Sequence, residues 1–162
     1  MLKLTGLILI VIACFGAGYY LSLRLKNRFE FLSAFKDFLS NLETNIRYNS
    51  SEIFSLVKAS APDKIRELFS KNTSENFQTY WSECVTNLPK RYALKNDDIN
   101  LLYEFGRMLG TTDTEGEINH IKLYRELIES NINNSEKELK QKSKLMKLLG
   151  LFAGLSLALL LL

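Results

Sequence analysis

The chain has few of the residues on which covalent or metal chemistry depends. Its 162 residues include one histidine, His120, and two cysteines, Cys14 and Cys84. A zinc site needs several such ligands at suitable spacing, and a secreted disulfide scaffold needs more than two cysteines. No GxxxxGK[ST] or GxGxxG motif of a nucleotide loop is present, and no serine or cysteine has a convincing histidine base. We therefore expect no enzyme, no catalytic residues, no cofactor and no metal, with Cys84 a reduced core residue.

The chain also lacks a large excess of either charge. It has 21 lysines and arginines and 18 aspartates and glutamates, a formal charge of +3, with both signs interspersed. This balance argues against a nucleic-acid partner. What is unusual is the placement of the charge, because residues 4–23 and 148–162 contain no Asp, Glu, Lys or Arg. A simple soluble domain does not segregate its charge in this way.

The first uncharged run, Leu4–Leu23, has the length of a membrane-spanning helix. Twenty residues of helix rise about 30 Å, the thickness of the hydrocarbon core of a bilayer. A signal peptide is the alternative, but its apolar region is normally about 7–15 residues long and is followed by a small-residue cleavage site. The small residues here lie inside the run. We favour an uncleaved anchor.

The second run, Leu148–Leu162, is a marginal span of about 22 Å. The stems of Lys144 and Lys147 can extend towards the lipid headgroups and add usable length. A hydrophobic tail buried in a soluble core is the alternative. We favour a membrane helix because the run is apolar on every side, whereas a surface helix has a polar face.

Basic residues predict how the two spans are oriented. Basic residues follow the first span and precede the second, and they are rare on the far sides: Arg24, Lys26, Arg28, Lys137, Lys140, Lys142, Lys144 and Lys147. Such residues face the cytoplasm. The sequence therefore predicts an N-terminal transmembrane helix at 1–25, a cytoplasmic helical domain at 26–144 and a C-terminal transmembrane helix at 145–162. The basic stretch at 135–144 is either a solvated helix face or a region attracted to anionic lipid, and the two are compatible.

Small residues recur at helical spacing in both spans. Gly150, Gly154 and Ala158 form one strip, and the first span carries the pairs Ala13/Ala17 and Cys14/Gly18. Such strips let helix backbones approach closely in lipid, although membrane helices are rich in glycine and alanine in any case. We expect the strips to pack against a partner helix, within one subunit or between subunits.

The polar middle of the chain has the pattern of an all-α domain. Apolar residues from Phe29 to Ile46 recur mostly at steps of three and four, with no glycine or proline separating them from the first span. We expect one long helix here, then shorter helices. One of these ends before Pro89, and another is capped by Asn96 and stopped by Gly110. A last helix starts near Glu117. The fold class is therefore a helical bundle flanked by transmembrane helices.

The segment from Phe105 to Ile121 stands out in this domain. It combines two glycines in or beside a helix end, a threonine-rich turn and two possible capping pairs, Thr112 with Glu115 and Thr114 with Glu117. One interpretation is a tight connection between helices, with Gly106 allowing close packing and Gly110 a left-handed backbone. The other is an exposed, rigid partner-docking loop formed by Thr111, Thr112, Asp113, Glu115, Gly116 and His120.

Four stretches of the sequence resemble the stage III sporulation protein AB family of endospore-forming bacteria. They are MLKLTGLILIVIA, LSNLETNIRYNSSEIF, LKNDDINLLYEFGRMLGTTDTEGEINHI and the apolar C-terminus. Where the family usually has a glutamine after the glycine matching Gly116, this chain has Glu117. The family is itself similar to the cytoplasmic helical domain of type II secretion platform proteins.

The resemblance implies a function and partners. It implies a platform of a secretion-like channel between mother cell and forespore, in the outer forespore membrane, with the central domain in the mother-cell cytoplasm. The implied partners are a secretion-type ATPase, the stage III sporulation protein AA, and other channel proteins. We also expect a homo-oligomer. The alternative is a membrane-tethered adaptor or regulator that binds another cytoplasmic protein.

Overall fold

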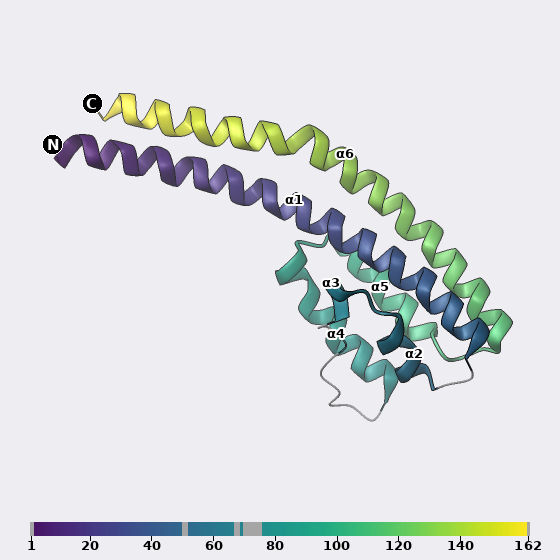
Figure 1. Ribbon diagram of the computed structural model, residues 1–162. Coiled ribbons are helices and arrows are strands. Elements are labelled where there is room, and N and C mark those ends of the chain that lie inside the picture. Colours follow the sequence, from purple (N-terminus) through teal and green to yellow (C-terminus); the bar gives the residue numbers. More distant parts are fainter. Residues whose placement is uncertain (1, 50–51, 67–68, 70–75, 162) are drawn as a thin grey trace. The chain divides into compact units, whose positions relative to one another are not determined.

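The chain is helical throughout its described part. The computed structural model describes residues 2–49, 52–66, 69 and 76–161, and these contain no strand, which confirms the all-α class (Figure 1). Two long helices, α1 and α6, flank four shorter ones. The bounds are α1 Leu2–Tyr48, α2 Ile53–Ser60, α3 Asp63–Arg66, α4 Phe77–Tyr92, α5 Asn96–Met108 and α6 Thr114–Leu160.

The long helices contribute to two compact units. The first consists of Met1–Asn27 and Asn134–Leu162 and is called here the terminal helix pair. The second, Arg28–Asn133, is called the helical body. As predicted, one uninterrupted helix leads from the N-terminal apolar run into the body, since α1 extends from Leu2 to Tyr48.

The helical body is built around a core of large apolar side chains. The predicted periodic face of α1 is buried, and Phe38, Leu39 and Leu42 are fully enclosed. Trp81 of α4 lies among the rings of Phe35, Phe38 and Phe105, with centroids 5.6–6.3 Å away. Its indole Nε1 donates a hydrogen bond to the Leu102 carbonyl over 2.8 Å, so the polar atom of this buried ring is satisfied.

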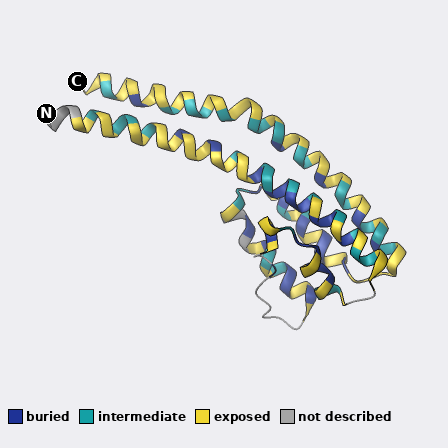
Figure 2. Cartoon of the chain, viewed as in Figure 1, coloured by how far each residue is buried: buried dark blue, intermediate teal, exposed yellow. Residues whose placement is uncertain are grey.

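In the terminal helix pair the apolar side chains face outward. The outer parts of α1 and α6 lie side by side (Figure 1) and are mostly exposed in Figure 2. Ile8 is 58% exposed and Leu159 is 76% exposed. By length and composition both helices are apolar enough to cross a membrane. An apolar tail buried in a soluble core, the alternative for the C-terminal run, would not show this exposure.

Three predicted helix ends are wrong by a few residues. Helix α4 does not end before Pro89 but runs on to Tyr92, and the chain turns at Ala93, whose φ is 55°. Helix α5 has Asn96 as its first residue and Lys95 as its cap, because the Asp98 carboxylate accepts the Lys95 N–H over 2.9 Å. Helix α6 begins at Thr114 rather than near Glu117.

Candidate functional site

The turn between α5 and α6 is exposed at its tip. Helix α5 ends at Met108, and Gly110 follows with a φ of 83°, a left-handed conformation that favours glycine. Thr111, Thr112 and Asp113 are exposed, and so are Thr114 and Glu115 at the start of α6. The residues of the predicted docking loop up to Glu115 therefore lie together on the surface of the body.

Glu117 holds this turn from beneath. Its side chain is buried, and its Oε1 accepts hydrogen bonds from the backbone N–H groups of Gly110, Thr111 and Thr112 over 2.9, 3.0 and 3.1 Å. The Thr112 hydroxyl also donates to Oε1 over 3.1 Å. One carboxylate oxygen thus fixes three successive backbone N–H groups of an exposed turn. The sequence pattern predicts Glu117 only as a capping partner of Thr114, and its position beside Gly116, where the family usually has a glutamine, is the one signal of a larger role.

Asp113 caps α6. Its Oδ1 accepts the backbone N–H of Gly116 over 3.1 Å, the usual geometry of an N-cap with the third helical residue. The predicted capping pairs Thr112–Glu115 and Thr114–Glu117 are replaced by this bond and by the Glu117 network. A Cβ atom at Gly116 would lie 2.8 Å from both Asp113 Oδ1 and Thr112 Oγ1, so a larger residue here would have to displace the capping side chain.

Two of the selected residues face inward rather than towards the turn. The His120 ring stacks on Phe105 with centroids 5.4 Å apart, and its Nε2 lies 3.2 Å from the Phe105 carbonyl. Gly106 lies directly against the Trp81 indole, where an added Cβ would overlap the ring. His120 therefore packs α6 against α5, apart from the exposed tip of the turn, whereas Gly106 allows α5 to pack closely against α4.

A buried ionic cluster joins three helices of the body. Arg28 Nε and Nη2 of α1 donate to the Asp98 carboxylate of α5 over 2.7 and 3.0 Å. The Asn131 amide of α6 donates to the same carboxylate over 3.0 Å. The Asp98 side chain is fully buried, and that of Arg28 is 6% exposed. The sequence pattern predicts Arg28 as a membrane-flanking charge and Asp98 as a helix-start acid, because residues 70 apart give no local signal of pairing.

The small-residue strips of the terminal helix pair meet each other. A Cβ at Gly150 would lie 2.7 Å from the Cys14 carbonyl, and one at Gly154 would lie 3.0 Å from Val11 Cα. Gly18 lies against the backbone at Met146 and Gly150. The contact is therefore made within one chain by the Cys14/Gly18 strip. The Ala13/Ala17 pair is exposed, and Ala158 is half-buried.

Burial favours the neutral forms of two neighbouring side chains of the body, Tyr80 and Cys84. Burial raises the pKa of the Tyr80 hydroxyl and of the neighbouring Cys84 thiol, and the two groups hydrogen-bond to each other. A thiol with a raised pKa is a poor nucleophile at neutral pH. Within the described residues, no group of three or more His, Cys, Asp or Glu side chains is placed to hold a metal ion.

Comparisons with known proteins converge on one family. The model of the stage III sporulation protein AB family matches residues 3–162. Stage III sporulation protein AB of Bacillus subtilis (strain 168) is 28% identical over 170 aligned residues, which cover 99% of each chain. No solved structure matches.

Proposed function

Because the chain belongs to the stage III sporulation protein AB family and so has a role in sporulation, we propose that it is a non-enzymatic membrane platform. In this proposal the terminal helix pair crosses the outer forespore membrane, and the body lies in the mother-cell cytoplasm. There the body binds a secretion-type ATPase, the stage III sporulation protein AA, and couples it to the proteins of a channel.

The observation that carries this proposal is the combination of exposure and rigidity in the turn at 110–117. The tip of the turn is exposed, yet three of its backbone N–H groups are fixed by Glu117 and the next helix is capped by Asp113. A surface that is already ordered loses little conformational entropy when a partner binds. Such a turn suits the docking of a rigid protein such as an ATPase.

Charge supports the orientation within the membrane. All the basic residues of the terminal helix pair except Lys3 lie between the apolar runs and the body: Arg24 and Lys26 follow one run, and Lys137 to Lys147 precede the other. This asymmetry favours a cytoplasmic body. The exposed Glu115 gives the turn a negative charge that can steer a basic surface of the partner, with an attraction that weakens as salt rises.

The experiment is a crosslink and pull-down of the full chain from sporulating cells, followed by identification of the captured proteins. Wild-type protein should retain the ATPase and channel proteins, whereas Glu115→Lys should retain much less of the ATPase. Glu126→Lys makes the same charge reversal at an exposed position further along α6 and serves as the matched control. Asp113 is not a suitable position, because its carboxylate caps α6.

Two results would contradict the proposal. Equal ATPase retention by wild-type protein and Glu115→Lys would place the docking face away from the turn. Capture of a signalling protein without ATPase or channel proteins would favour a membrane-tethered adaptor over a platform.

A further inference from the structure

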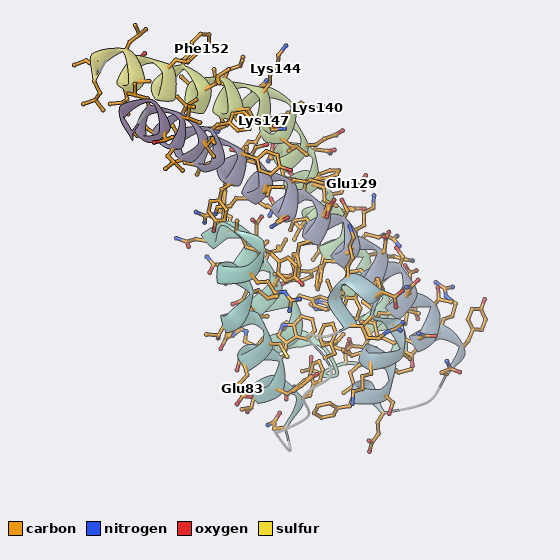
Figure 3. The ribbon with its side chains drawn as sticks, turned by 60° about the vertical axis from the view of Figure 1, so that its left-hand side comes forward. Glu83, Glu129, Lys140, Lys144, Lys147 and Phe152 are labelled. Atoms are coloured by element: carbon orange, nitrogen blue, oxygen red, sulfur yellow. The ribbon has the colours of Figure 1, made fainter. Side chains whose placement is uncertain are left out.

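We propose that Lys144 and Lys147 bind the phosphate of an anionic phospholipid at the membrane surface. The proposal rests on the membrane insertion included in the proposed function, but it needs neither the docking turn nor the ATPase. Both lysines belong to the part of α6 that lies in the terminal helix pair, and Figure 3 shows Lys140, Lys144 and Lys147 following one another along that helix ahead of Phe152.

The terminal helix pair has too few carboxylates to neutralise its own lysines. It contains eight lysines and arginines but only two acidic residues, Glu136 and Glu138. Each is taken by a lysine one turn later: Lys140 Nζ lies 2.6 Å from Glu136 Oε1, and Lys142 Nζ lies 3.2 Å from Glu138 Oε1. Among the described residues of the pair, neither Lys144 nor Lys147 has a carboxylate partner. An anion that neutralises them must come from outside the pair.

The two apolar runs end at different levels along the pair, and this places Lys147 beside an uncharged part of α1. Ser22 Oγ of α1 lies 2.6 Å from Ser143 Oγ of α6. One turn further in, the Lys147 ammonium lies 5.5 Å from the centroid of the Tyr19 ring. The charge-free run of α1 therefore extends beside α6 from the level of Lys147 as far as the level of Ser143, about 6 Å along the helix axis. In a bilayer, Lys144 and Lys147 lie where hydrocarbon gives way to headgroups.

This position selects a lipid phosphate as the partner. An ammonium group at the edge of the hydrocarbon is disfavoured unless it reaches water or an anion, and the long lysine stem lets it reach the headgroup layer, where both are present. Phosphates are the anions of that layer. Tyr19 is exposed beside Lys147, and a tyrosine hydroxyl at this depth can donate a hydrogen bond to a headgroup. The contact with Tyr19 also restrains Lys147 before a lipid arrives.

A net negative headgroup fits this site better than a zwitterionic one. In a zwitterionic lipid the phosphate is accompanied by its own cation, so two lysines gain little net attraction. Each lysine near an anionic surface contributes about a fivefold preference for anionic lipid. We therefore expect selection of phosphatidylglycerol over phosphatidylcholine.

The test compares two double variants that remove the same charge from the same helix. Lys144→Gln with Lys147→Gln removes the proposed site, whereas Lys140→Gln with Lys142→Gln removes two lysines already bonded to glutamates. The full chain is purified in micelles containing equal amounts of phosphatidylglycerol and phosphatidylcholine, and the retained lipids are counted by native mass spectrometry. In the first variant, the preference for phosphatidylglycerol over phosphatidylcholine should fall roughly fivefold for each lysine removed. In the control, this preference should stay within about twofold of wild type. Lys144→Arg with Lys147→Arg should keep the preference, because it keeps both charges.

Two outcomes would overturn the lipid site while leaving membrane insertion intact. An equal loss in both glutamine variants would show diffuse attraction to the whole basic region, and an unchanged preference in both would show no attraction at these positions. Circular dichroism of each variant checks that helix content is kept. Release of the wild-type chain from membranes by alkaline carbonate would contradict insertion itself, and with it both the proposed function and the lipid site.

Discussion

Helices α1 and α6 reverse their burial between the helical body and the terminal helix pair. In the body, α1 buries Phe31, Phe35 and Phe38, whereas in the terminal pair it exposes Ile8 and Leu9 (Figure 2). In water, large apolar residues gain free energy when they are buried against each other. In lipid that gain is absent, and helices associate through small residues and polar contacts. With the terminal pair in a membrane, as proposed, each long helix follows one packing rule in water and another in lipid.

The contacts in each unit follow these rules. The body is held by aromatic rings around Trp81 and by the buried Arg28–Asp98 pair. The terminal pair is held by Gly18, Gly150 and the hydroxyl contact of Ser22 with Ser143. The same type of substitution should therefore change the stability of the two units by different amounts.

The largest effect is expected from breaking the buried ionic cluster. Arg28→Met leaves the Asp98 carboxylate buried without its cation, which should destabilise the body by about 3–5 kcal/mol. Lys36→Met removes the exposed pair between Lys36 and Glu129, 3.0 Å apart, and should cost about 1 kcal/mol or less. Urea unfolding followed by Trp81 fluorescence measures both. Similar losses in the two variants would mean that the cluster does not stabilise the body as its burial indicates.

The next largest difference between the two units is expected from the effect of a single added methyl group on stability. Gly106→Ala forces a Cβ into the Trp81 ring and should destabilise the body by about 1–3 kcal/mol. Gly16→Ala, in the terminal pair, meets no atom within 4 Å and should change stability by about 0.5 kcal/mol or less. The same unfolding measurement applies, and an unaffected Gly106→Ala protein would contradict the close approach of α5 to Trp81.

Bulky residues at the contact of the terminal pair should have a smaller effect and spare the body. Gly150→Ile with Gly154→Ile should weaken the contact by about 1–2 kcal/mol. The contact is measured by disulfide formation between Ser22→Cys and Ser143→Cys, in a chain whose two native cysteines are replaced by alanine. Disulfide formation should fall when Gly150→Ile and Gly154→Ile are added. Ala153→Ile, at an exposed position of the same helix, is the control. Undiminished disulfide formation in the glycine variant would remove the packing role.

Alkaline pH should affect the body alone and only slightly. Cys84 and Tyr80 have ordinary pKa values of 9.0 and 10.0, and burial raises the pKa of both in the folded chain. Above pH 9 the unfolded state therefore loses protons that the folded state keeps, so stability falls as pH rises, by about 1 kcal/mol between pH 8 and pH 9.5. Urea unfolding at the two pH values measures this fall. Cys84→Ser should remove most of it, and an equal fall in that variant would assign the effect to other groups.

Local pattern predicted the elements of the fold but not the polar contacts between them. Periodicity identified the buried face of α1, and charge-free length identified the two apolar helices. The Arg28–Asp98–Asn131 cluster was not predicted, because its members lie on three helices and each has an ordinary local explanation. The hydrogen bonds of Glu117 to the turn were not predicted for a related reason, because a glutamate in a first helical turn resembles a simple cap. Pairing across the fold depends on tertiary geometry that spacing along the chain does not encode.

The most direct test of the account is the topology of the two apolar helices. Single cysteines are placed at Leu127, exposed in the body, and at Leu161, exposed at the end of the terminal pair, with Cys14 and Cys84 replaced by alanine. The variants are expressed in vegetative bacterial cells and treated with a membrane-impermeant maleimide. The account predicts that Leu161→Cys is labelled in intact cells and that Leu127→Cys is labelled only after permeabilisation. Labelling of Leu127→Cys in intact cells, or protection of Leu161→Cys until permeabilisation, would contradict a cytoplasmic body held between two membrane-spanning helices.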